Sequence, residues 1–261
     1  MSQSALAGEP SPLCGVVLLD KPVGPTSFAM VRVVRRLSRV ARVGHTGTLD
    51  PFASGLLTIC IGRAATRLVP RLMAGEKEYV ATLQLGVETE TQDPEGQVVR
   101  QAPVPALTAA DLEVCLVPLR GRRLQQPPRY SALKHQGKPL YYYARKGIDV
   151  TKPPREIEIR VMDNLGYDPV QQRLTLRVAC SPGTYIRTLA EEIGRALGCG
   201  AHLVALRRLR SGGFLVDGAL SAAELAGEDA AELLAGRLLS VEQILALLDG
   251  PMSAVHGPDF P

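Results

Sequence analysis

Asp50 lies in the stretch of the chain whose residue types are best suited to chemistry. Residues 42–58 form an irregular segment of small polar residues with three glycines and one proline, and Asp50 directly precedes that proline. An aspartate before a proline in such a loop usually belongs to a turn or caps a helix. The other interpretation is that its carboxylate is the reactive group of a site. Taken alone, the loop favours the structural role.

The spacing of the cysteines and histidines does not match that of a metal site. Five cysteines are scattered along the chain without a Cys-x-x-Cys pair, and the four histidines do not cluster with them. This argues against a disulfide framework and against zinc. Nucleotide-binding glycine motifs are also missing. We therefore expect reduced thiols, no metal and no cofactor. The cysteines are Cys14, Cys60, Cys115, Cys180 and Cys199.

Charge is distributed unevenly along the chain. Residues 212–261 hold one base and eight acids, which leaves 29 bases and 18 acids in residues 1–211, a net charge of +11. Such asymmetry is typical of a surface that binds a polyanion, although many solvated faces are also basic. No apolar run is long enough to span a membrane, and the first dozen residues lack the order of a signal peptide. We expect a cytoplasmic location.

The segment 120–160 combines positive charge with aromatic rings. It contains 11 bases, three acids and four tyrosines, and its prolines and glycines interrupt any long regular element. Cations that neutralise phosphates and rings that stack on unpaired bases are what a nucleic-acid contact requires. An irregular, solvated insertion fits the composition equally well. If the segment is such a contact, Lys134, Lys138, Arg145 and Lys146 are the side chains that we expect to reach the phosphates.

Periodicity predicts the elements that must position these groups. Residues 14–20 form an apolar run typical of a buried strand, and residues 78–85 and 174–180 alternate like strands. Residues 185–197 predict a helix, with Gly198 suited to the position after its end. Residues 220–248 turn Ala- and Leu-rich and acidic, which predicts surface helices.

A second helix follows the turn signal KPVGPTS, with Thr26 or Ser27 as its cap. Apolar residues recur along it at helical spacing, at Met30, Val33, Leu37 and Val40. Four arginines share another face without an acid to pair with them, at Arg32, Arg35, Arg36 and Arg39. Unpaired arginines on one face either lie in water or contact phosphate, and composition favours water.

Six segments, in order, resemble the TruB-type tRNA pseudouridine synthases. They cover most of residues 14–214 and read LLDKPVGPTS (18–27), GHTGTLDPFASGLL (44–57), KEYVATLQLG (77–86), PPRYSALKHQGKPLYYYARKGI (127–148), GTYIRTLAEEIG (183–194) and GCGAHLVALRRLRSGGF (198–214). The resemblance implies an α+β pseudouridine synthase fold, with a central mixed β-sheet flanked by helices and loops, and a basic thumb-like insertion at about 118–155. It also implies conversion of uridine 55 in the tRNA T-loop to pseudouridine.

The implied reaction breaks the bond between ribose and uracil, turns the base, and rejoins it through carbon without a cofactor. It requires one carboxylate at the sugar, and Asp50 matches the aspartate that the family uses as its nucleophile. Whether that carboxylate attacks the sugar or first removes a sugar proton stays open. Tyr79 matches the tyrosine that stacks on the target base and takes part in removing its C5 proton. Arg187 matches the arginine that pairs with the aspartate and would keep Asp50 ionised.

Four further residues match substrate-binding positions of the family. Leu206 matches an apolar residue of the uracil pocket, and a purely core role fits it nearly as well. His45 matches the histidine that fills the gap left by the flipped nucleotide, although a bond to local backbone is the alternative. Lys21 and Tyr185 match positions near the site, where we expect them to support it.

The resemblance also divides the chain. We expect a flexible tail at 1–12, a catalytic domain at 13–214, acidic helices packed on the body at 215–250, and a tail at 251–261. Many bacterial members continue into an RNA-binding PUA barrel, and residues 251–261 are too few to form one. The expected partner is the tRNA T-arm, with no membrane, no metal and no obligate protein partner. The alternatives are a tRNA-binding chaperone without catalysis, and a synthase that acts on another RNA.

Overall fold

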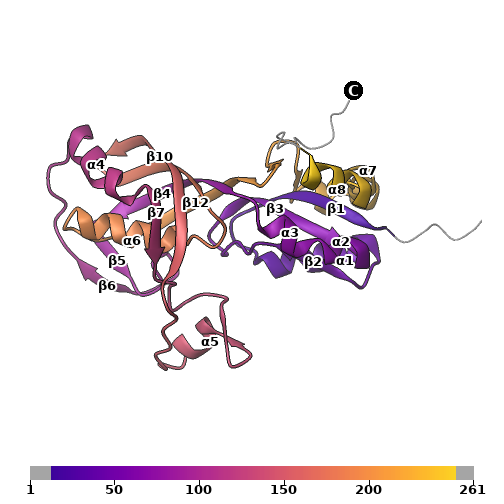
Figure 1. Ribbon diagram of the computed structural model, residues 1–261, viewed down its shortest axis with the longest axis horizontal. Helices are drawn as coiled ribbons and strands as arrows, with labels where there is room; N and C mark the ends of the chain where they lie inside the picture. The colour runs from indigo at the N-terminus through magenta and orange to yellow at the C-terminus, as the bar shows by residue number, and fades with distance from the viewer. Residues whose placement is uncertain (1–12, 251–261) are drawn as a thin grey trace, which may run out of the picture.

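The computed structural model describes residues 13–250, so the two expected tails lie outside the described residues. Ten strands form one mixed sheet (Figure 1), which confirms the expected α+β architecture. Pairing is antiparallel except between β14 and β1 and between β12 and β3. The order is β14 (Leu220–Ser221), β1 (Gly15–Lys21), β3 (Ser54–Ile61), β12 (Ala201–Ser211), β4 (Lys77–Leu85), β11 (Arg173–Cys180), β10 (Arg155–Asp168) and β7 (Gly121–Gln125), with β2 (Val43–Thr46) on β3 and β13 (Phe214–Leu215) on β12.

The predicted apolar strand is β1, and it is buried on both faces. Val17 and Leu19 belong to the larger hydrophobic cluster, whereas Val16 and Leu18 belong to a second cluster on the opposite face. A strand covered on both faces has a continuous apolar sequence instead of an alternating one. The alternating strands are β4 and β11, where the sheet has one core face and one partly exposed face.

Helix α1 (Ser27–Ser38) forms where it was expected, but its buried face is shifted. The buried apolar residues are Met30, Val31 and Val34, while Val33 and Leu37 are only partly buried. Val40 lies outside the helix, because Arg39 takes a left-handed conformation with φ 55° and ends it. The four arginines of the other face are all exposed.

Helix α6 (Ile186–Ala196) lies against β12 and brings the arginine of the GTYIRT segment into the body of the protein. Leu197 caps its C-terminus, and Gly198 follows with φ 79°, as predicted. Gly194 allows the close approach of helix and strand. A Cβ atom at Gly194 would lie 2.1 Å from the backbone nitrogen of Ala201, the first residue of β12.

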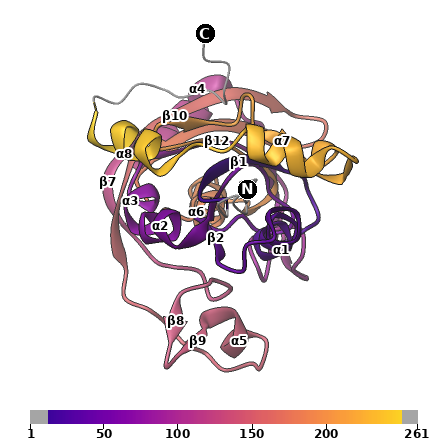
Figure 2. The same ribbon diagram turned by 90° about the vertical axis from the view of Figure 1, so that its right-hand side faces the viewer.

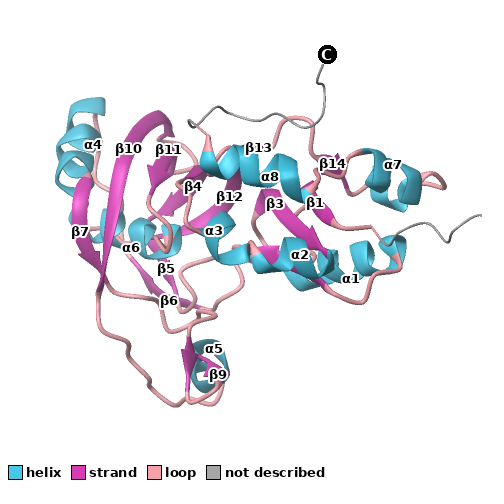
Figure 3. Cartoon of the chain, turned by 45° about the vertical axis from the view of Figure 1, so that its right-hand side comes forward, coloured by secondary structure: helices cyan, strands magenta, loops and turns pink. Residues whose placement is uncertain are grey.

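The insertion that leaves the sheet is shorter than expected. Residues 121–125 pair with β10 as strand β7, and Arg155 begins β10, so the excursion covers residues 126–154. It contains the hairpin of β8 (Lys134–His135) and β9 (Lys138–Pro139), followed by α5 (Leu140–Ala144). Figures 1 and 3 show this segment, here called the thumb, projecting away from the sheet.

The C-terminal segment contributes more than helices. Residues 220–221 add strand β14 to the sheet edge beside β1, and Leu239 exchanges two backbone hydrogen bonds with Val16. A strand of two residues is too short to give a periodic signal, so the sequence did not predict it. The expected helices are present as η2 (Glu224–Ala226), α7 (Ala230–Gly236) and α8 (Val241–Asp249). Figure 2 shows α7 near α1.

The remaining elements connect these parts. They are α2 (Gly62–Arg67), α3 (Val69–Met73), the hairpin of β5 (Val87–Thr89) and β6 (Val98–Gln101), α4 (Ala109–Leu116) and η1 (Val117–Leu119). Within residues 13–250, no helix combines the length and apolar character needed to cross a membrane.

The contact at Gly194 yields a stability prediction. Gly194→Ala forces a Cβ against the backbone of residues 200 and 201, so we expect the free energy of unfolding to fall by roughly 1–3 kcal/mol. Gly236→Ala is the matched control, because Gly236 also lies in a helix and has no atom within 4 Å of its added Cβ. Urea unfolding followed by circular dichroism measures both. Equal stability of the two variants would contradict the close packing of α6 on β12.

Candidate active site

A cavity of about 370 Å³ opens where the loop carrying Asp50 faces the sheet. Pockets for small ligands commonly measure roughly 300–1000 Å³. Five stretches of chain line this cavity: the loop 47–50 with Met73 nearby, strand β4, residues 131–133 at the start of the thumb, residues 181–187 with Arg155, and strand β12. Its charged, tyrosine and strand β12 lining residues are Asp50, Lys77, Tyr79, Arg155, Tyr185, Arg187, Leu206 and Arg208.

Hydrogen bonds to the turn before α1 hold the Asp50 loop. The hydroxyl of Ser27 donates to the carbonyl of Leu49 at 2.9 Å and accepts from its N–H at 2.8 Å. Gly24 N–H donates to the carbonyl of Pro51 at 2.8 Å. Thr26, not Ser27, caps α1. The sequence left those two residues as alternative caps, and the structure uses Ser27 to fix the loop on the N-terminal side of Asp50.

Arg187 is a buried guanidinium that joins two carboxylates. Its Nε lies 3.1 Å from Oδ2 of Asp50, and its Nη1 lies 3.2 Å from Oδ2 of Asp93. It also donates to the backbone carbonyls of Thr91 at 2.9 Å and Tyr130 at 2.7 Å. The side chain of Asp93 is 5% exposed and that of Asp50 is 36% exposed. Of the two carboxylates, Asp50 is therefore the one a substrate in the cavity can reach.

The electrostatics of Asp50 differ from the simple expectation. Burial raises the pKa of the Asp50 carboxyl, and the charge of Asp93 raises it further, while Arg187 and Lys21 lower it. The net direction is upward, so burial outweighs Arg187. Arg187 limits the rise of this pKa and does not reverse it.

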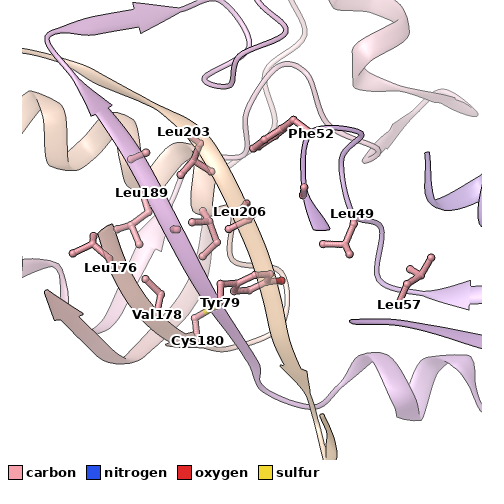
Figure 4. Close-up of a cluster of buried hydrophobic side chains, with 14 of the residues drawn as sticks. Leu49, Phe52, Leu57, Tyr79, Leu176, Val178, Cys180, Leu189, Leu203 and Leu206 are labelled. Atoms are coloured by element: carbon pink, nitrogen blue, oxygen red, sulfur yellow. The ribbon is translucent and has the colours of Figure 1, made fainter. Parts of the chain in front are cut away.

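Tyr79 and Leu206 lie together on neighbouring strands across from the loop. Both side chains are 8% exposed and both line the cavity. Figure 4 shows them beside Leu203 and facing the loop that carries Leu49 and Phe52. Burial raises the pKa of the Tyr79 phenol, and the neighbouring Arg208 opposes that rise. The wall they form is an apolar surface with one phenol, suited to the face of a planar base.

Lys21 and Tyr185 each contact residues next to the site, through different interactions. The buried ammonium of Lys21 donates to the carbonyls of Pro22 and Pro25 at 2.8 Å each and of Pro51 at 3.4 Å. Burial lowers its pKa to about 8, against the opposing charge of Asp50. The backbone of Tyr185 exchanges two hydrogen bonds with the side chain of Gln125, and Arg155 stacks 4.6 Å from its ring. Tyr185 thus joins α6 to both ends of the thumb.

His45 and the two thumb lysines lie outside the cavity lining. His45 is on β2, partly exposed, and its buried Nδ1 has no hydrogen-bond partner in the described part of the chain. Lys134 and Lys138 are exposed on the hairpin of the thumb. Lys138 donates to the hydroxyl of Tyr142 at 3.0 Å and lies 4.3 Å from the centre of that ring.

Several charged residues of the site were not predicted from the sequence, among them Lys77, Arg155, Asp93 and Arg208. Asp93 lies in an irregular turn and carries no local signal, because only the fold brings it to Arg187. Arg208 had a usable signal: it is two residues beyond Leu206 on a strand, so alternation places both side chains on the same face. No group of three His, Cys, Asp or Glu side chains able to hold a metal occurs among residues 13–250.

Family models match nearly the whole described chain. Residues 35–186 match the model described as TruB family pseudouridylate synthase (N terminal domain). Residues 187–246 match that of the tRNA pseudouridylate synthase B C-terminal domain. A protein named tRNA pseudouridine synthase B from Desulfotalea psychrophila is 54% identical over 237 residues, which cover 90% of this chain and 96% of that protein. A protein of the same name from Thiobacillus denitrificans is 50% identical over 216 residues, which cover 83% of this chain and 71% of that protein.

The fold comparison agrees with the sequence comparison. The structure resembles a chain in the crystal structure of a Cbf5–Nop10–Gar1 complex, with a TM-score of 0.65 and 29% identity. That match covers 88% of this chain and 60% of the other. The family models, the relatives and the paired carboxylate and guanidinium at one cavity agree, and the chain belongs to the TruB family of pseudouridylate synthases.

Proposed function

We propose that this protein converts uridine 55 in the T-loop of tRNA to pseudouridine, with Asp50 as the catalytic carboxylate. The observation that carries the proposal is the position of Asp50. It lies at a cavity, partly exposed, bound to the buried Arg187, and opposite Tyr79 and Leu206. The similarity to proteins named tRNA pseudouridine synthase B supports tRNA as the substrate.

The arrangement of the cavity suits a flipped uridine. Tyr79 and Leu206 offer an apolar wall to the face of uracil, and Asp50 faces the sugar. Asp50 then either attacks the sugar or takes a sugar proton, and the base detaches, turns, and rejoins through C5. Tyr79, with its hydroxyl in the cavity wall, takes part in removing the C5 proton. Extrusion of the base costs about a few kcal/mol, which contacts made only by the flipped nucleotide offset.

The surroundings of the cavity suit a folded RNA loop. We assign His45, on β2, to fill the space that the flipped nucleotide leaves. The exposed basic side chains of the thumb, Lys134 and Lys138 among them, then contact RNA phosphates. The thumb rings are already in contact with its cations: Lys146 lies 4.6 Å from the Tyr142 ring, and Arg145 lies 5.4 Å from the Tyr141 ring. A tRNA substrate implies a cytoplasmic location.

Asp50→Asn tests catalysis directly. We expect turnover to fall by several orders of magnitude while tRNA affinity stays nearly unchanged, because phosphate contacts dominate affinity. Tritium release from C5-labelled uridine in tRNA measures the reaction, and filter binding measures affinity. Asp249→Asn is the control, since Asp249 pairs with Arg71 at the exposed end of α8. Near wild-type release by Asp50→Asn would remove this carboxylate from the mechanism, and a wild-type protein that binds tRNA without release would be a chaperone.

Arg187→Met tests the electrostatic role of the guanidinium. Ionised Asp50 is the active form, so activity falls as the pH drops through its pKa. Arg187 lowers that pKa, so its removal raises the pKa and moves the acid limb of the pH profile to higher pH. Single-turnover rates across a pH series measure the shift. Arg195→Met, an exposed arginine of the same helix paired with Glu191, should leave the profile unchanged. An unchanged profile and rate in Arg187→Met would show that Arg187 does not act on Asp50.

The thumb is tested by its salt dependence. We expect neutralisation of Lys134, Lys138, Arg145 and Lys146 to glutamine to weaken tRNA binding. The log–log slope of affinity against salt should flatten by about 0.7–0.9 for each phosphate that the variant protein no longer neutralises. Folding should change little, because all four side chains are exposed.

The matched variant neutralises three exposed arginines of α1 and the exposed arginine that ends it, namely Arg32, Arg35, Arg36 and Arg39. If the thumb variant is folded and keeps the wild-type slope while the slope of the α1 variant flattens, the thumb does not contact RNA phosphates and α1 carries the binding.

A further inference from the structure

Arg208 is a buried cation of the cavity that has no carboxylate partner within residues 13–250. It is 2% exposed, lines the cavity from β12, and forms no ion pair with any described residue. Arg187, the other buried arginine of the site, binds both Asp50 and Asp93. Removing an ion from water costs several kcal/mol, and an opposite charge normally offsets that cost. The two arginines therefore differ in charge compensation: carboxylates neutralise Arg187, whereas no carboxylate of residues 13–250 neutralises Arg208.

Neutral acceptors hold Arg208 in place. Its Nε donates to the carbonyl of Leu56 at 2.7 Å, and its Nη2 donates to the carbonyl of Gly47 at 3.0 Å. These carbonyls lie on either side of Asp50 along the loop. In the sheet Arg208 pairs with Gly55 of β3 and Tyr79 of β4. Carbonyl groups satisfy the hydrogen bonds of a guanidinium but leave its charge uncompensated.

Neighbouring groups respond to this charge. Burial lowers the pKa of Lys77 to about 8, and Arg208 lowers it further. Burial lowers the pKa of His45, and Arg208 adds to that effect. Arg208 therefore adds positive potential at Lys77 in the cavity wall and at His45 on β2, and neither of these basic side chains can neutralise it. A cavity with such a potential favours a ligand group that carries negative charge.

The proposed reaction creates such a group. When the bond between C1′ and N1 breaks, its electron pair stays on uracil, which becomes an anion. If Asp50 attacks C1′, its carboxylate becomes a neutral ester. If Asp50 takes the sugar proton, it becomes a neutral acid, and the electron pair of the broken C–H bond forms a double bond in the sugar as uracil leaves. In both cases one negative charge moves from Asp50 to the base.

We propose that Arg208 is a catalytic residue that stabilises the negative charge on the detached uracil. Arg187 stabilises the negative charge while it is on Asp50, and Arg208 stabilises it once it is on the detached uracil. A preorganised cation that meets charge only as it develops lowers the barrier, because it is not already neutralised in the ground state. The inference rests on the proposed function.

The test varies the stability of the uracil anion. T-arm stem-loop RNA is prepared with uridine or with 5-fluorouridine at the target position. Fluorine withdraws electrons and stabilises the anion by itself, so less depends on the protein. Under single-turnover conditions, disappearance of the target nucleoside is measured after digestion by mass spectrometry. We expect Arg208→Gln to slow the uridine RNA by about 100-fold or more, and to slow the 5-fluorouridine RNA by a factor at least roughly tenfold smaller.

Conservative and neighbouring variants separate charge from structure. Arg208→Lys keeps the charge and removes the fork of hydrogen bonds, so it should slow both RNAs by the same factor. Arg207→Met is the control, because Arg207 adjoins Arg208 on β12 but pairs with Asp20 at 2.7 and 2.9 Å. RNA affinity and circular dichroism verify binding and folding. Arg208→Met replaces the glutamine variant if that variant does not fold.

The outcomes distinguish the two proposals. An active wild-type protein whose neutral Arg208 variant is slowed equally on both RNAs would overturn the role of Arg208 and leave the proposed function intact. A purely structural clamp on Gly47 and Leu56 gives that result. A wild-type protein that transforms neither RNA would overturn both.

Discussion

The ion pair between Arg187 and Asp50 is the interaction on which the rest of the site depends. The guanidinium reaches it from α6 and binds at the same time to the turn at residues 91–93 and to Tyr130 at the start of the thumb. One buried side chain therefore joins the Asp50 loop, a turn after β5, the helix and the base of the insertion. Because a buried guanidinium tolerates few unsatisfied donors, these four parts must keep fixed relative positions.

The charges of the cavity are unevenly shared, and that asymmetry has a chemical meaning. The two carboxylates lie at Arg187, whereas Arg208 has only carbonyl acceptors among the described residues. In the resting protein the negative charge is held at the loop. The raised pKa of Asp50 shows that even there the balance is narrow, since burial outweighs the arginine. In the proposed mechanism, the negative charge moves from this carboxylate to a uracil that Arg208 stabilises.

The sheet makes this arrangement possible. Strand β12 lies between β3, which follows the Asp50 loop, and β4, which carries Tyr79. Leu206 and Arg208 thus lie between the loop and the phenol, while α6 packs on the same strand and brings Arg187. Gly194 sets how closely that helix approaches. The thumb lies outside this sheet, since it leaves between β7 and β10 and returns directly to it.

The sequence by itself determined the strands with strong periodicity, the helices at α1 and α6, and the residues that carry the family motifs, including Asp50, Tyr79 and Arg187. These signals are local, because burial repeats every second residue in β4 and both faces of β1 are covered. The sequence did not predict β14, the exact buried face of α1, or the start of the thumb, since each depends on what packs against a short segment. Only the fold brings Asp93 to Arg187 and leaves Arg208 without a carboxylate partner among residues 13–250. Charge pairing between distant segments follows from three-dimensional proximity, and no local pattern encodes it.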